Sequence, residues 1–276
     1  LMAWGLSGWI LTYNDWQWVF WIPGSAIVIY AFLWHLLIKE HPKDAGMEFS
    51  GPLLDSGNNS NNNSNEGRKE QRYTLWQVVK STKLWYIVIA CFAHGIIKEG
   101  IGLWGPTFLI ETYGLSIGFA SGAILLVPVF SLLGIILAGW LNKKFGYREK
   151  YTIMALLAGG MIMIVSLAQF GSAGIFYGVV FLGAVSAMMY GANTLLLGVI
   201  PLGFAKYQKT SSVAGFLDFC SYLAAGIAAS VTGFLVDRIG WNGVLGIWTI
   251  VSITGFISLL ASLRAEKGIA TYGNRA

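Results

Sequence analysis

Apolar residues gather in long stretches separated by short polar segments, instead of alternating with polar residues along the chain. A helix needs about 20 mostly apolar residues to cross a bilayer, whereas a spanning β-strand would alternate the two residue types. The pattern therefore predicts an all-α polytopic membrane protein with seven complete transmembrane helices and, at residues 1–12, the end of an eighth. The complete stretches are 18–38, 84–110, 115–141, 151–170, 173–205, 210–236 and 239–263.

The composition supports this class. Hydrophobic residues make up 55% of the 276 positions and charged residues only 11%, whereas soluble domains contain about 25% charged residues. Two cysteines, Cys91 and Cys220, are too few for a disulfide framework or a four-ligand zinc site. The chain contains no phosphate-cradling Walker loop and no spacing of His, Cys and Asp typical of a metal site. We therefore expect neither an enzyme nor a bound cofactor or metal.

Lysine and arginine lie mainly on one side of the predicted membrane. Sixteen of the 18 fall in segment 39–83, loops 142–150 and 206–209, and tail 264–276, which share a side. Because cytoplasmic loops carry the excess of positive charge, we predict a cell-membrane protein (plasma or inner membrane) whose linker and C-terminus are cytoplasmic. The net charge of +5 is then a signal of topology and predicts no nucleic-acid partner.

Segment 39–83 also divides the chain. Its residues 57–67 (GNNSNNNSNEG) form a low-complexity polar stretch with nothing to bury, and residues 73–83 have the pattern of an amphipathic surface helix. The chain opens on Leu1 inside an apolar stretch, so we expect it to be the C-terminal part of a longer protein. The predicted domains are the end of an N-terminal six-helix half (1–38), a cytoplasmic linker (39–83), a C-terminal six-helix half (84–264) and a cytoplasmic tail (265–276).

Several motifs in this layout resemble one family of membrane carriers. Residues 15–46 begin with DWQWVFWIPG and end with EHPKDAG, residues 98–109 read KEGIGLWGPTFL, and residues 211–226 read SSVAGFLDFCSYLAAG. The order of these motifs resembles the major facilitator superfamily, and their details resemble its organophosphate:phosphate antiporters, the glycerol-phosphate and hexose-phosphate carriers. Residues 139–148 (GWLNKKFGYR) resemble the superfamily loop G-x-x-x-D-[RK]-x-G, with Asn142 in place of the aspartate.

The resemblance implies a 12-helix fold in which two six-helix halves rock about a site at the membrane midplane. The first half of that site, with a second phosphate-binding cation, would lie in cis before this chain. Lys98 stands where the family typically has a phosphate-binding arginine, Tyr190 and Tyr222 match tyrosines of its tenth and eleventh helices, and Trp104 belongs to its seventh-helix motif. The family often has YGP after the tenth-helix tyrosine, whereas this chain has YGA.

Charged residues inside predicted spans point to the same site. A charge in a span costs about 2.5–3.5 kcal/mol on insertion scales and usually faces a cavity or a partner. Lys98, Glu99 and Asp218 are such residues, and neutral His94 lies on the face of Lys98 four positions earlier. Lys98 is the candidate phosphate contact, or else it only neutralises an acid. His94 is a candidate donor or proton relay, or else a core histidine.

Two neighbouring stripes distinguish the faces of the helix predicted at 210–236. Asp218 and Tyr222 continue through Gly226 and Ser230 as a polar, open stripe, whereas 221, 225, 229 and 233 are all small, as in tight helix contacts. Asp218 is therefore a candidate for coupling, or for a salt bridge with Lys98 when the carrier is empty. Glu99 points about 100° round the helix from Lys98, and it is a candidate to carry a proton or to form a salt bridge, for example with a residue of the preceding half. The predicted substrate-binding residues are Lys98, His94, Tyr190, Asn193, Tyr222 and Trp104, and the predicted cytoplasmic gate loop contains Lys143, Lys144 and Arg148.

Three functions remain open. The first is exchange of organic phosphates for inorganic phosphate by alternating access, in a monomer embedded in the bilayer. The second is a proton-coupled permease for a carboxylate or sugar acid, which the replacement of Arg by Lys and the presence of Glu99 favour. The third is a sensor of sugar phosphates that does not transport.

Overall fold

The computed structural model describes residue 10, residues 15–37 and residues 74–273. The chain divides into two units, Leu1–Gln71 and Arg72–Ala276. All regular structure of the described residues is helical, which confirms the predicted all-α class. The apolar stretch at residues 1–12 and the low-complexity segment 57–67 lie outside the described residues, apart from residue 10.

The first unit contains one described helix, α2 (Trp18–Leu37). It ends within one residue of the predicted span 18–38 and continues through Pro23. Every described turn of this helix carries exposed apolar side chains, such as Trp21 and Phe32, as expected of a helix whose surface meets lipid or other helices.

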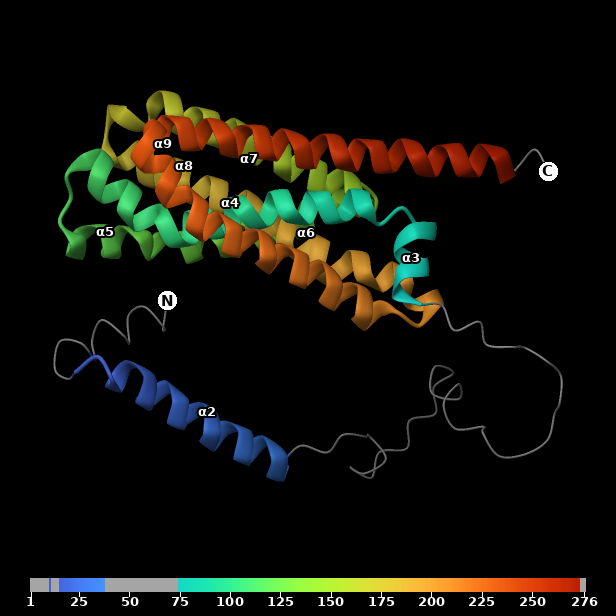
Figure 1. The fold of residues 1–276 in the computed structure, drawn as a ribbon, viewed down its shortest axis with the longest axis horizontal. Coiled ribbons are helices and arrows are strands. Elements are labelled where there is room, and N and C mark those ends of the chain that lie inside the picture. Colours follow the sequence, from blue (N-terminus) through green and yellow to red (C-terminus); the bar gives the residue numbers. More distant parts are fainter. Residues whose placement is uncertain (1–9, 11–14, 38–73, 274–276) are drawn as a thin grey trace. The chain divides into compact units, whose positions relative to one another are not determined.

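The second unit is a helical bundle (Figure 1). It begins with the short surface helix α3 (Leu75–Ser81), which lies within the predicted amphipathic segment 73–83. Among the described residues, five helices of this unit are long and apolar enough to cross a membrane, and α2 of the first unit is a sixth. The remaining helices are α4 (Trp85–Tyr113), α5 (Ile117–Ile124), α6 (Leu126–Lys144), α7 (Glu149–Phe170), α8 (Ile175–Asn193) and α9 (Thr210–Gly273).

The continuous ribbon of α9 contains two helices. Gly240 has φ 67° and ψ 175°, a combination that is essentially restricted to glycine. The chain therefore changes direction there, and residues 210–239 and 241–273 are separate helices. This break accounts for the two predicted spans at 210–236 and 239–263.

Prolines mark two interruptions that the apolar pattern alone did not predict. The stretch 115–141 is divided at Leu125, three residues before Pro128, because proline cannot donate a helical hydrogen bond and crowds the preceding turn. The stretch 173–205 changes from α8 into a π-helical turn (Thr194–Val199) and then a 3-10 helix (Ile200–Tyr207) with Pro201 in its first turn. By contrast, α4 continues through Pro106.

Small residues bring the helices of the bundle together. A Cβ on Gly95 of α4 would lie 2.6 Å from the backbone oxygen of Ser221 on α9. A Cβ on Gly134 of α6 would collide with the backbone of Ala187 on α8. The stripe that begins at Ser221 is thus a packing surface, as its small residues predict.

A tight turn joins α6 to α7. Gly146 has φ 67°, and Tyr147 N–H donates to the carbonyl of Asn142 (2.8 Å) while Gly146 N–H donates to that of Lys143 (3.0 Å), as in a Schellman motif. The buried Asn142 side chain also accepts a hydrogen bond from the hydroxyl of Thr152 (3.1 Å). The residue that replaces the superfamily aspartate therefore fastens the end of α6 to the start of α7.

Candidate functional site

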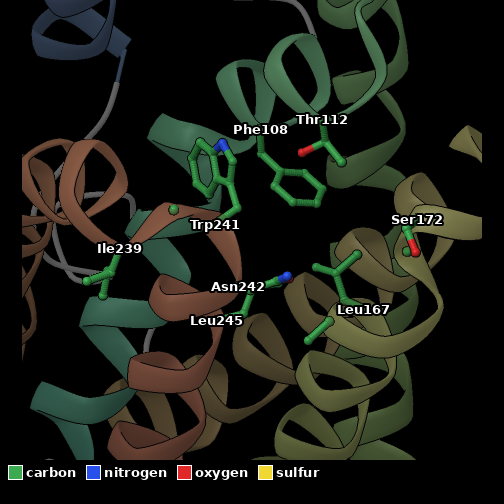
Figure 2. A pocket seen from close by; sticks show the side chains of 11 residues that line it. Phe108, Thr112, Leu167, Ser172, Ile239, Trp241, Asn242 and Leu245 are labelled. Atoms are coloured by element: carbon green, nitrogen blue, oxygen red, sulfur yellow. The ribbon is translucent and has the colours of Figure 1, made fainter.

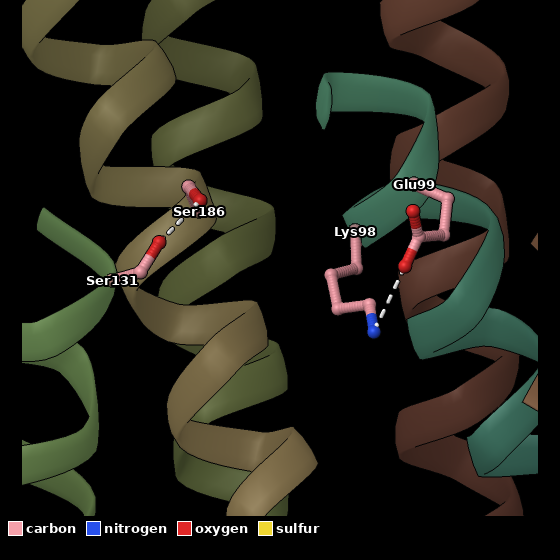
Figure 3. A network of polar contacts seen from close by, with 4 residues as sticks. All are labelled: Lys98, Glu99, Ser131 and Ser186. Carbon is pink, nitrogen blue, oxygen red and sulfur yellow. Dashed lines mark hydrogen bonds and ion pairs between the residues drawn. The ribbon is translucent and has the colours of Figure 1, made fainter. Parts of the chain in front are cut away.

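Lys98 lies in the middle of α4, where the seventh-helix resemblance places the phosphate contact. Its side chain is only 9% exposed, and its Nζ lies 2.9 Å from Oε1 of Glu99, whose side chain is 27% exposed (Figure 3). The two residues point about 100° apart on the helix, yet their flexible stems bridge this angle. The buried ammonium of Lys98 is thus paired with the carboxylate of the next residue, Glu99.

Two tyrosine rings flank the same ammonium. Nζ of Lys98 lies 5.5 Å from the ring centroid of Tyr190 on α8 and 5.8 Å from that of Tyr222 on α9. Both distances lie within the range of cation–π attraction. The structure therefore brings together three of the predicted substrate-binding residues, from three different helices.

His94 is fully buried one turn before Lys98. Its imidazole lies near the backbone of Cys91 and Met189, but neither ring nitrogen makes a hydrogen bond of good geometry within the described residues. Buried polar atoms without partners are uncommon in folded proteins. His94 therefore retains unused hydrogen-bonding capacity beside the cation, which is compatible with either role predicted for it.

Asn193 and Trp104 are the two remaining predicted substrate-binding residues. Asn193 ends α8 one turn after Tyr190, and its buried Oδ1 has no hydrogen-bond partner within the described residues. Trp104 lies in the contact between α4 and α9, where its Nε1 donates to the carbonyl of Ala229 (3.3 Å) and its ring covers Gly233. Trp104 therefore packs between α4 and α9, at positions other than Lys98.

Asp218 does not pair with Lys98 in this structure. It lies one turn before Tyr222 on an exposed face of α9, with Gly226 and Ser230 further along, and Tyr222 itself is 61% exposed. The predicted open stripe is thus exposed in the bundle, while the neighbouring small-residue stripe is largely covered. The acid that forms an ion pair with Lys98 is Glu99, on the same helix.

The predicted gate residues lie around the α6–α7 turn. Lys144 lies over the ring of Trp140 (5.1 Å) and Arg148 over that of Tyr151 (5.9 Å), while Lys143 is exposed in the last turn of α6. These are local contacts within one loop. They are compatible with a latch and equally with a simple basic flank.

Two polar contacts within the bundle could not be predicted from the sequence. The hydroxyls of Ser131 on α6 and Ser186 on α8 lie 3.0 Å apart in the bundle interior (Figure 3). Near the end of α4, Glu111 accepts a hydrogen bond from Nε1 of Trp241 (2.8 Å). Single serines in apolar stretches give no distinctive signal, and Glu111 falls just beyond the predicted end of its span at residue 110.

A cavity of about 290 Å³ lies beside this second feature (Figure 2). The rings of Phe108 and Trp241 form one side of it, and Thr112, Ser172 and Asn242 contribute polar atoms. None of the predicted substrate-binding residues lines this cavity. It is therefore separate from the group around Lys98.

Sequence comparisons identify the family to which this arrangement belongs. A family model described as the Major Facilitator Superfamily matches residues 1–201. The chain belongs to the Major Facilitator Superfamily. Its apolar helices are accordingly those of a multi-pass membrane protein.

Curated relatives agree with the resemblance seen in the motifs. A glycerol-3-phosphate transporter from Bacillus subtilis is 26% identical over 92% of this chain and 55% of the relative. A probable hexose phosphate transport protein from Chlamydia trachomatis is 21% identical over 95% of this chain and 60% of the relative. A hexuronate transporter from Escherichia coli K12 is 20% identical over 95% of this chain and 61% of the relative. The chain thus spans little more than half the length of these relatives.

Proposed function

We propose that this chain forms the C-terminal part of a secondary active transporter that exchanges organic phosphates for inorganic phosphate by alternating access. The observation that carries the proposal is the buried ammonium of Lys98, flanked by Tyr190 and Tyr222. A buried cation within a membrane bundle is costly unless it serves a partner or a ligand. The names of relatives that carry phosphorylated solutes support phosphate as the ligand.

Charge explains how a phosphate would compete for Lys98. The carboxylate of Glu99 offers one negative charge at 2.9 Å, whereas a phosphate monoester carries close to two at neutral pH. Coulomb attraction grows with the charge of the anion. In this proposal the empty carrier keeps Lys98 neutralised by Glu99, and an incoming phosphate displaces the carboxylate.

The surrounding groups would complete the contact. The Tyr190 and Tyr222 hydroxyls can donate to phosphate oxygens, and His94 offers ring nitrogens that make no good hydrogen bond within the described residues. A lysine supplies a point charge, without the bidentate fork of arginine. Orientation of the phosphate therefore depends more on these neutral donors than it would beside an arginine. We assign the remaining contacts to the preceding half of the protein, in cis.

A second candidate function follows from Glu99. An acid beside the binding cation suits a proton-coupled permease for a sugar acid, because a protonated Glu99 would release Lys98 to bind a carboxylate. A relative named hexuronate transporter supports this alternative. The two candidates differ in ligand charge and in proton movement.

One experiment separates them. The protein, expressed from its complete reading frame, is reconstituted in proteoliposomes, and uptake of labelled glycerol 3-phosphate and glucuronate is measured with and without an inward proton gradient. The exchanger predicts phosphate-ester uptake that requires internal phosphate and ignores the gradient. Glucuronate uptake driven by the gradient without internal phosphate would support the permease. Absence of both in folded protein would contradict both transport proposals.

A further inference from the structure

A second cavity, larger than that of Figure 2, lies at the end of the bundle that carries the basic loops. Its volume is about 680 Å³, within the range of small-molecule sites. It is bounded by the start of α4, the start of α7, the 3-10 helix Ile200–Tyr207 and the late part of α9. It shares no residue with the group around Lys98.

The lining combines positive charge with hydroxyl groups. Among the described lining residues, Lys83 and Lys150 contribute two ammonium groups and Glu149 one carboxylate, so these residues together carry positive charge. Nζ of Lys150 donates to the hydroxyl of buried Ser262 (2.8 Å), which holds the ammonium at the cavity wall. Ser81 and Thr82 add further hydroxyl oxygens to the same wall.

The backbone at Lys83 is unusual. Its φ is 54°, a left-handed conformation that few residues other than glycine and asparagine adopt. Such conformations persist where the surrounding structure enforces them and are common at ligand sites. Here the conformation occurs at the turn between α3 and α4, and it places a lysine among the residues that line the cavity.

The aromatic and apolar groups near the cavity are of the kind found at membrane surfaces. Trp76 and Trp85, on either side of Lys83, form an edge-to-face pair with centroids 5.2 Å apart, and both are well exposed. Exposed tryptophans gather at the level of lipid head groups. Ile87, Leu202 and other apolar side chains form the rest of the wall. A ligand with a phosphate and an apolar body matches this combination.

We propose that this cavity binds the phosphate-bearing head group of an anionic phospholipid, with Lys83 and Lys150 as its cationic contacts. Basic pockets between the ends of membrane helices are known to bind such head groups. The volume exceeds that of a phosphate alone and leaves room for the glycerol backbone beside the apolar wall. This proposal is independent of what the carrier transports.

Lipid-dependent stability tests it. The protein from its complete reading frame is purified in micelles, and its unfolding temperature is measured as phosphatidylglycerol or phosphatidylcholine is added. We expect phosphatidylglycerol to stabilise the wild type more strongly. Lys83→Gln and Lys150→Gln should each raise the half-saturating phosphatidylglycerol concentration about fivefold, since one lysine near an anionic surface contributes about 1 kcal/mol. Lys80→Gln, on α3 but outside the cavity lining, is the matched control and should not.

Two results would overturn the proposal. One is an equal response to phosphatidylglycerol in wild type, Lys83→Gln and Lys80→Gln, which would place the lipid effect elsewhere. The other would come from adding inorganic phosphate in place of lipid. If phosphate stabilised the wild type as strongly as phosphatidylglycerol does, and Lys83→Gln abolished this effect, the cavity would be a site for soluble anions. Because Lys83 is exposed, its variant remains informative even if Lys150→Gln fails to fold.

Discussion

At the scale of single residues, the candidate site centres on one buried cation, Lys98, and its closest acid, Glu99. Both Glu99 and Asp218 were predicted partners for Lys98, and the structure pairs the lysine with Glu99. An angle of about 100° on a helix suggests separate faces, so the sequence alone does not favour Glu99 over Asp218. Long side chains cross that angle easily, and a low-dielectric interior favours the nearest counter-ion.

This pairing predicts the effect of removing the acid. In Glu99→Gln, the buried ammonium loses its counter-ion, so the empty protein should be destabilised while phosphate binds roughly tenfold more tightly, about 1.4 kcal/mol. Competition by unlabelled phosphate in a binding assay measures the change. Asp218→Asn is the control and should leave phosphate affinity nearly unchanged. Equal tightening in both variants would refute a specific role for Glu99.

At the scale of helices, the apolar stretches predicted which segments form spans but not where they break. Length and hydropathy identify a span because the bilayer demands about 20 apolar residues, and five predicted stretches coincide closely with described helices. The break at Leu125 lies three positions before Pro128, within the turn that a proline disturbs. The change at Thr194 lies seven positions before Pro201, and α4 continues through Pro106, so prolines alone do not predict the breaks. The contacts between helices depend on which small residues face each other. Of these contact surfaces, only the small-residue stripe of α9 could be predicted from the sequence.

The α6–α8 contact gives an element-scale prediction. Gly134→Ala would push a methyl group into the backbone of Ala187, and overpacking of this kind costs about 1–3 kcal/mol. The unfolding temperature of the purified protein should therefore fall by several degrees. Gly139→Ala, on the same helix with nothing within 4 Å of the new carbon, should be neutral or slightly stabilising. Equal behaviour of the two variants would contradict the close approach of α6 and α8.

At the scale of the whole molecule, the sequence predicts the family, whereas it predicts only some of the contacts of the candidate site. Lys98 was identifiable because a charge inside a span is rare, and its two tyrosines because their motifs resemble those of known carriers. The packing role of Trp104 and the bond between Glu111 and Trp241 depend on helix neighbours far apart in the chain. No local pattern encodes such contacts.

The charge bias of the loops predicts the orientation of the molecule. In a variant lacking the buried Cys91 and Cys220, a single cysteine at exposed Tyr147 should react with a membrane-impermeant maleimide only after the cells are permeabilised. A cysteine at exposed Ser172, in the next loop, should react in intact cells. The reverse pattern would show that the basic loops face outward and would overturn the predicted topology.

The central claim is that Lys98 binds a phosphate group during exchange. The most direct measurement is phosphate counterflow in proteoliposomes containing the protein from its complete reading frame, loaded with unlabelled phosphate and given labelled phosphate outside. We predict rapid counterflow in wild type, retention of activity in Lys98→Arg, and a loss of at least about 100-fold in Lys98→Met, because removing a buried charged contact costs about 3 kcal/mol or more. Wild-type counterflow that survives in a folded Lys98→Met protein would contradict the account.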